Sequence, residues 1–197
     1  HFLSVNTVEP PQRQRFTICH EIAHIVLGLP SHHEEVPSWS FVKRDINETF
    51  CDMFAAELLM PHAQWREKLK GEEPSLEVIE RMAAEFDVSF PAAASRLAAL
   101  SDWPCAWVTM ERGVVRHAAR STALRHARAW IAPRTPIPPG SVAHRLRESG
   151  VSGVGFEDVA QDVWFQDWDA GLDLRGIARL YPASETTGSQ MWSEEGE

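Results

Sequence analysis

Apolar residues at helical spacing run through the first hundred residues of the chain. The clearest pattern covers residues 12–27, and Gly28 followed by Pro30 predicts the C-terminal end of that helix. Further helices are predicted over residues 46–61, 62–69, 75–86 and 90–100. Alternation over residues 2–7 predicts a short strand, and the turn-rich residues 31–45 predict a loop. We therefore expect a first half that is mostly helical.

The pattern changes near Trp103, where strand-like segments replace helical ones. Residues 105–110 and 114–120 predict a β-hairpin. Further strands are predicted over residues 127–133, 162–168 and 176–182, with a short helix over residues 139–150. The fold class is therefore α+β. The predicted parts are a helical core over residues 1–70, a helix-turn-helix-like pair over 71–102, a β-rich domain over 103–185 and a disordered tail over 186–197.

The composition excludes membrane-spanning classes of protein. The chain has 197 residues, of which 44% are hydrophobic and 24% charged, an ordinary balance for a globular protein. No run of 18 apolar residues and no basic-then-apolar leader is visible, so no membrane partner is expected. The cysteines Cys19, Cys51 and Cys105 form no C-x-x-C pattern, which favours a reduced, cytoplasmic setting.

The net charge of −9 is concentrated in the helix-turn-helix-like pair. Residues 71–102 hold seven acidic and two basic side chains, and only Arg81 and Arg96 are available there to contact phosphates. Nucleic-acid binding depends on basic side chains. Direct DNA binding is therefore not expected, and packing of this pair against the helical core is favoured.

The β-rich half separates its charges along the chain. Eight arginines and no acid lie between Arg112 and Arg147, and seven acids and no base lie between Glu148 and Asp173. The simpler interpretation is that the two stretches lie side by side and neutralise each other. The alternative is that the arginine stretch recognises an anionic ligand or a partner protein. Five tryptophans of this half are expected in the core: Trp103, Trp107, Trp130, Trp164 and Trp168.

The stretch His20-Glu21-Ile22-Ala23-His24 lies within the first predicted helix. Residues four apart on an α-helix are separated by about 40° in rotation and about 6 Å along the axis, so both imidazoles can reach one metal ion. Zinc lowers the pKa of a bound water, and a carboxylate beside the first histidine can move its proton. We therefore predict His20 and His24 as zinc ligands and Glu21 as the catalytic base. The alternative is an ordinary amphipathic helix that carries polar residues.

A catalytic zinc site needs a third protein ligand. The downstream candidates are His32, His33, Glu34, Glu35, Asp45, Glu48, Asp52 and Glu57. Glu48 and Asp52 share one face of the second helix with small residues, whereas Glu57 lies about 180° away from Glu48. We predict Glu48 as the ligand and Asp52 as a partner for a histidine N–H. Asp45 and residues 32–35 stay open as substitutes.

Two blocks of sequence, QRQRFTICHEIAH (12–24) and ETFCDMFAAELLMP (48–61), resemble the ImmA/IrrE family of bacterial metallopeptidases. The resemblance covers residues 2–100. It implies a gluzincin-like, mostly helical metallopeptidase domain that has a further element ahead of residue 2. Longer relatives of the radiation-response type also carry a GAF-like sensing domain after the helical pair, so the resemblance implies a regulatory or recognition role for the β-rich half.

The same resemblance implies roles for single residues. His20, His24 and Glu48 take the zinc-ligand positions and Glu21 the position of the base, whereas Asp52 stands where the family usually has asparagine. The implied activity is hydrolysis of a peptide bond in a helix-turn-helix transcriptional repressor, which induces stress-response or mobile-element genes. An acidic enzyme suits such a basic, DNA-binding substrate. The alternative is a regulatory binding protein that keeps the metallopeptidase fold without hydrolysis.

Overall fold

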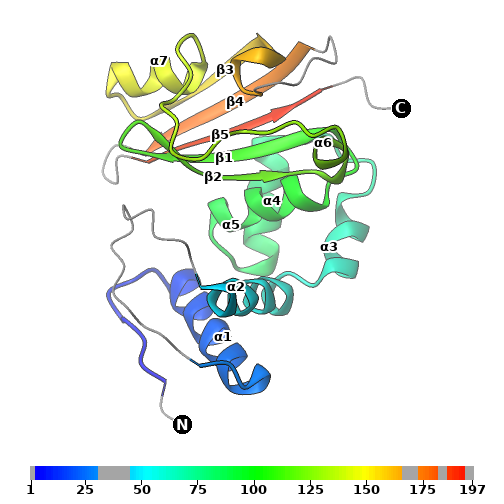
Figure 1. Ribbon diagram of the computed structural model, residues 1–197, viewed down its shortest axis with the longest axis vertical. Helices are drawn as coiled ribbons and strands as arrows, with labels where there is room; N and C mark the ends of the chain where they lie inside the picture. The colour runs from blue at the N-terminus through cyan, green and yellow to red at the C-terminus, as the bar shows by residue number, and fades with distance from the viewer. Residues whose placement is uncertain (1–2, 31–44, 166–172, 182–185, 194–197) are drawn as a thin grey trace.

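The computed structural model describes residues 3–30, 45–165, 173–181 and 186–193 (Figure 1). The helices of its first half are α1 (Pro11–Leu27), α2 (Ile46–Leu59), α3 (His62–Leu69), α4 (Leu76–Phe86) and α5 (Phe90–Leu100). The predicted helices of this half are therefore confirmed. The strand predicted over residues 2–7 is wrong, because residues 3–6 adopt no regular structure and lie far from the sheet (Figure 1). The predicted loop over residues 31–45 falls outside the described residues, except for Asp45.

The second half of the chain forms an antiparallel sheet. Its strands are β1 (Cys105–Glu111), β2 (Val114–Arg120), β3 (Gly153–Ala160), β4 (Asp173–Tyr181) and β5 (Thr186–Trp192), in the spatial order β2-β1-β5-β4-β3. The predicted hairpin is β1 and β2, and Arg112 and Gly113 at its turn have φ of 51° and 80°. Positive φ at both central residues matches the twist of paired strands. The remaining helices described are α6 (Thr122–His126), α7 (Val142–Ser149) and the short 3₁₀ helix η1 (Gln161–Val163).

Two strands predicted in this half are wrong. Residues 127–133 form the chain that follows α6, where Ala129 and Ile131 are buried without belonging to a strand. Their alternation reflects loop side chains that fill the core. The segment predicted over residues 162–168 instead begins within η1, and its residues after Phe165 lie outside the described part. The helix predicted over residues 139–150 is α7, and the strand predicted over residues 176–182 is the greater part of β4.

The tail predicted to be disordered over residues 186–197 instead supplies β5, which lies between β1 and β4. Thr187, Ser189 and Gln190 are buried in this strand. Because these side chains are polar, the sequence shows no alternation from which a strand would be predicted. Hydrogen bonds to neighbours on both sides satisfy the backbone of such a strand.

A hydrophobic core lies on each face of the sheet. On one face, α4 and α5 pack with Trp65 of α3 against Trp107 and Trp192. On the other face, α6 and α7 cover a second cluster that includes Met110 and Met191. The first cluster crosses the division predicted near residue 102, so the helices and the sheet share one core. The helix-turn-helix-like pair packs on the sheet and also, as expected, against the helical core, through Met60 and Trp65.

The pair of helices α1 and α2 lies at the end of the molecule remote from the sheet (Figure 1). Its helices approach closely because Ala23, Cys51 and Ala55 are fully buried between them. Two arginines connect α1 and the end of α2 to the helix-turn-helix-like pair. Arg15 of α1 forms an ion pair with Asp87 at 2.6 Å, and Arg96 of α5 donates to the Met60 carbonyl at 3.1 Å. No helix within the described ranges has the length and apolarity needed to cross a bilayer.

Candidate metal centre

Helix α1 carries His20 and His24 one turn apart. Gly28 follows the last residue of the helix and adopts φ of 63°, a left-handed conformation that suits glycine. The chain therefore turns back, and the Leu29 amide donates to the His24 carbonyl at 3.0 Å. The same turn places the Leu29 carbonyl 3.4 Å from Nδ1 of His24. The end of the helix thus orients one of the two imidazoles.

Helix α2 presents Glu48 and Asp52 to α1. The helix begins where the Asp45 side chain accepts a hydrogen bond from the Asn47 amide at 3.0 Å. Glu48 lies in the first turn, and Asp52 lies one turn later on the same face. Their side chains are 21% and 25% exposed, so water screens them only partly. The buried Cys51 between them lets α2 lie close against α1.

The donor atoms of three predicted ligands converge. Nε2 of His20 lies 3.2 Å from Nε2 of His24 and 3.1 Å from Oε2 of Glu48. Nε2 of His24 lies 3.4 Å from Oε1 of Glu48. The three groups can each offer one ligand atom within 4.8 Å of the others. Ligands about 2.0–2.1 Å from a tetrahedral zinc ion lie about 3.4 Å apart, so this spacing fits the metal.

The hydrogen bonds of the two Nδ1 atoms favour metal binding by the two Nε2 atoms. Oδ1 of Asp52 lies 2.9 Å from Nδ1 of His20, and the Leu29 carbonyl accepts from Nδ1 of His24. These partners assign the Nδ1 protons and leave a lone pair on each Nε2. Oε1 of Glu48 is buried and accepts no hydrogen bond from the described residues. Facing lone pairs beside an orphaned carboxylate oxygen fit a cation, and two imidazoles with one carboxylate suit zinc.

Nearby carboxylates also perturb the titration of this site. The hydrogen bond to Asp52 raises the pKa of His20, burial opposes the rise, and the charges of Asp52 and Glu48 add to it. Burial raises the pKa of Cys51, and the charges of Glu48, Asp52 and Glu21 raise it further. The site therefore favours positive charge and keeps the neighbouring thiol neutral. Glu21 is half-buried next to His20, and it is close enough for its charge to act on the thiol of Cys51.

Other predicted ligand candidates lie elsewhere. Asp45 caps α2 and is not part of the convergent group. Glu57 accepts a hydrogen bond from the His62 amide at 2.7 Å and pairs with Arg96, as expected for a residue on the opposite face of α2. Residues 32–35 lie outside the described residues. The Leu29 carbonyl was not predicted, because a backbone acceptor leaves no trace in side-chain spacing.

These features define a class of protein. Two imidazoles one helical turn apart and a carboxylate from a second helix form a ligand set, and a glutamate directly after the first imidazole completes the pattern of a metallopeptidase. Residues 1–98 match the family described as Peptidase_M78, the IrrE N-terminal-like domain, and the chain belongs to that family. The resemblance seen in the two sequence blocks is thereby confirmed.

Curated relatives match the same half of the chain. The radiation response metalloprotease IrrE of Deinococcus deserti is 34% identical over 103 residues, which cover 50% of this chain and 36% of the relative. The protein of the same name from Deinococcus radiodurans is also 34% identical over 103 residues, with 50% and 30% covered. The chain thus matches about a third of the length of these relatives.

A solved structure is similar over both halves. A Mycobacterium tuberculosis transcriptional regulator superposes with a TM-score of 0.60 at 15% identity, covering 94% of this chain and 65% of that one. At this identity the likeness is one of fold. It extends beyond residue 98, so the combination of helices and antiparallel sheet occurs in another protein.

Proposed function

We propose that this protein is a zinc-dependent endopeptidase whose substrate is a helix-turn-helix transcriptional repressor, and that cleavage induces stress-response or mobile-element genes. One observation carries the proposal: His20, His24 and Glu48 meet at ligand distances, and Oε1 of Glu48 lacks a hydrogen bond from the described residues. The family supports metallopeptidase activity. The acidic net charge of −9 suits a basic substrate.

The residues of this site have distinct roles in the proposed reaction. His20, His24 and Glu48 would hold the zinc ion. As a Lewis acid, the ion would polarise the substrate carbonyl and lower the pKa of a water molecule. Glu21 takes a proton from the attacking water and returns it to the leaving amine. Asp52 holds the ring of His20 in the orientation and tautomer that ligation requires.

The finer assignments of fold and setting are part of the same proposal. We assign a gluzincin-like arrangement to the helices α1 and α2 and a GAF-like one to the sheet. The sheet is antiparallel, has the order β2-β1-β5-β4-β3 and carries helices on both faces. A cytoplasmic setting suits the free cysteines, all of which are buried. DNA is not a proposed partner, because Arg81 pairs with Glu72 and Arg96 pairs with Glu57.

The test is cleavage of purified helix-turn-helix repressors from the source genome by the zinc-loaded protein, followed by mass spectrometry of the fragments. Glu21→Gln is expected to keep zinc and to lower the cleavage rate by about 10²- to 10⁴-fold. The matched control is Glu9→Gln, an exposed position before α1, which leaves the rate unchanged. Undiminished cleavage by Glu21→Gln overturns the mechanism. Binding of a repressor by the wild type without cleavage favours the non-hydrolytic alternative.

A further inference from the structure

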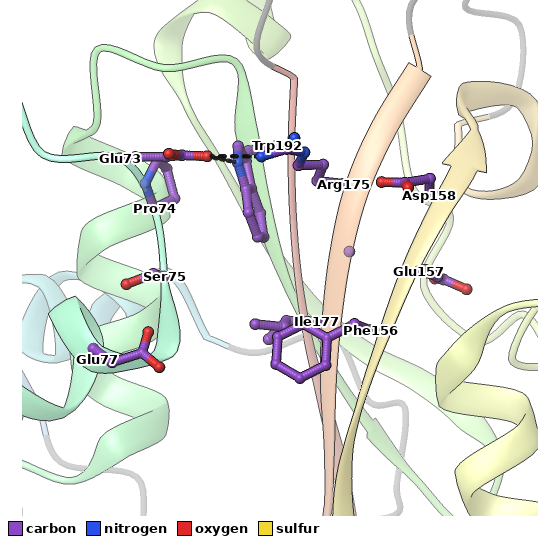
Figure 2. A pocket seen from close by; sticks show the side chains of 11 residues that line it. Glu73, Pro74, Ser75, Glu77, Phe156, Glu157, Asp158, Arg175, Ile177 and Trp192 are labelled. Atoms are coloured by element: carbon purple, nitrogen blue, oxygen red, sulfur yellow. Dashed lines mark hydrogen bonds and ion pairs between the residues drawn. The ribbon is translucent and has the colours of Figure 1, made fainter.

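A groove of about 600 Å³ lies between the start of α4 and the sheet, on the face that α5 covers only in part. Glu73 and Glu77 line one side, and Phe156 and Asp158 of β3 line the other (Figure 2). The buried Ile177 of β4 lies between the two sides. The groove belongs to the sheet, whereas the metal centre lies between α1 and α2 at the other end of the molecule (Figure 1).

One side of the groove exposes a large aromatic ring. Phe156 is 70% exposed, although Ile177, its partner across the strands, is only 3% exposed. Residues two apart on a strand point to the same face, so Phe156 and Asp158 both face the groove. Glu157 between them points to the opposite face, where its carboxylate accepts a hydrogen bond from the Val142 amide of α7. A phenyl ring left in water beside a carboxylate is an unused apolar contact surface.

The charges of the groove are predominantly negative. Arg175 is its basic side chain, and it lies 3.7 Å from Glu73, which also accepts a hydrogen bond from Nε1 of Trp192 at 2.8 Å. Glu77 and Asp158 have no ion-pair partner among the residues that the structure describes. The groove thus offers the carboxylates of Glu77 and Asp158 beside an exposed ring, with Arg175 opposite Asp158 on the neighbouring strand. A guanidinium can stack on an aromatic face and pair with carboxylates at the same time.

We infer that this groove is a docking site for an extended, arginine-bearing segment of the protein substrate. An arginine would stack its guanidinium on Phe156 and pair it with Asp158, while Glu77 on the opposite side adds negative charge to the groove. The identity of the partner rests on the proposed function, in which the substrate is a DNA-binding protein with a basic surface. Because the groove is remote from His20 and Glu48, docking raises the local concentration of the substrate and does not alter the chemical step. The groove therefore affects KM rather than kcat.

Binding can be measured without cleavage. The probe is a fluorescein-labelled peptide of alternating arginine and serine, titrated by fluorescence anisotropy with full protein that carries Glu21→Gln. A peptide of alternating glutamate and serine is the control probe. Phe156→Ala and Asp158→Lys are each expected to weaken binding of the basic peptide about fivefold or more. Glu148→Lys makes the same charge change on α7, on the other face of the sheet, and is expected to change affinity less than about twofold.

Equal affinity for wild type and both groove variants overturns the inference. So does an equal loss in Glu148→Lys, because binding would then depend on net charge alone. Phe156 and Asp158 are exposed, and unchanged thermal unfolding of each variant verifies that the fold is kept. If a repressor is cleaved and the groove variants leave its KM unchanged, docking fails while the proposed function stands. If the peptide binds the groove and no repressor is cleaved, the proposed function fails while docking stands.

Discussion

Metal affinity is expected to depend on a residue that does not itself bind the metal. Asp52 accepts a hydrogen bond from Nδ1 of His20 at 2.9 Å, and the two side chains are only 25% and 13% exposed. A hydrogen bond to a charged group in such a setting contributes about 1.5–3 kcal/mol. Asp52→Ala removes it and frees the ring to rotate. We therefore expect zinc affinity to fall about 10- to 100-fold, the range found when the partners of metal ligands are removed.

The measurement is a competition titration of zinc between the protein and a chromophoric chelator. Asp52→Asn is expected to lie between wild type and Asp52→Ala, because an amide oxygen accepts the same N–H without the negative charge. Asp102→Ala is the control, since Asp102 is 74% exposed and pairs with Arg66 away from the centre. An Asp52→Ala variant that binds zinc as tightly as wild type would refute the assigned role.

Three further predictions concern the metal, the pH dependence of stability and the packing of the sheet. His24→Ala removes a ligand and should leave the dialysed protein without stoichiometric zinc by mass spectrometry; full zinc content would contradict the site. Burial raises the pKa of Glu157 in the fold, so its stabilising contribution is complete below the unfolded pKa and is lost as pH rises through the folded one. In thermal melts, Glu157→Gln should therefore gain stability relative to wild type as the pH rises above the ordinary glutamate pKa of about 4.3. An equal pH dependence of the two melting temperatures would count against this. Gly188→Ala would place Cβ 2.2 Å from the buried ring of Trp107 and should cost about 1–3 kcal/mol in denaturant unfolding, whereas a change below about 0.5 kcal/mol would show that the ring can move.

The helices were predictable because each carries its own boundary signals. Gly28 ends α1, and Ser75 and Ser89 cap α4 and α5 by accepting hydrogen bonds from amides three residues on. His20 and His24 are four residues apart, as are Glu48 and Asp52, so the helical period sets each pair on one face of its helix. These local rules were therefore enough to nominate the residues that the structure brings together.

The sheet was less predictable because its strands depend on their neighbours. Gly153 and Gly155 weaken the strand signal of β3, yet a Cβ at Gly155 would lie 2.3 Å from Val142 of α7. Gly188 in β5 likewise makes room for Trp107 of β1. Requirements of this kind arise from residues distant in the chain, so spacing alone does not reveal them. The groove was not foreseen for the same reason, since it needs the register of β3, β4 and β5.

An ion pair from Arg145 joins the arginine stretch of the β-rich half to its acidic stretch. Arg145 lies 3.6 Å from the buried Glu157, in keeping with the interpretation that the stretches neutralise each other there. Arg120 instead stacks on Trp130, with 4.6 Å from its guanidinium carbon to the ring centroid. Trp130 is 49% exposed, so the expectation that it belongs to the core is wrong, whereas Trp107 and Trp164 are buried as expected.

The position of β5 between β1 and β4 has a consequence for biosynthesis. Ribosomes release the helical pair and the β1–β2 hairpin long before residues 186–192, so the hairpin must wait for the strand that joins it to β3 and β4. During that interval Trp107 lacks Gly188 and Trp192 as neighbours, so the nascent chain exposes apolar surface and an unpaired strand edge that favour aggregation. Expression at lowered temperature or with added chaperones should therefore raise the yield of this protein. The gain should exceed that for a protein whose central strand comes early in the sequence.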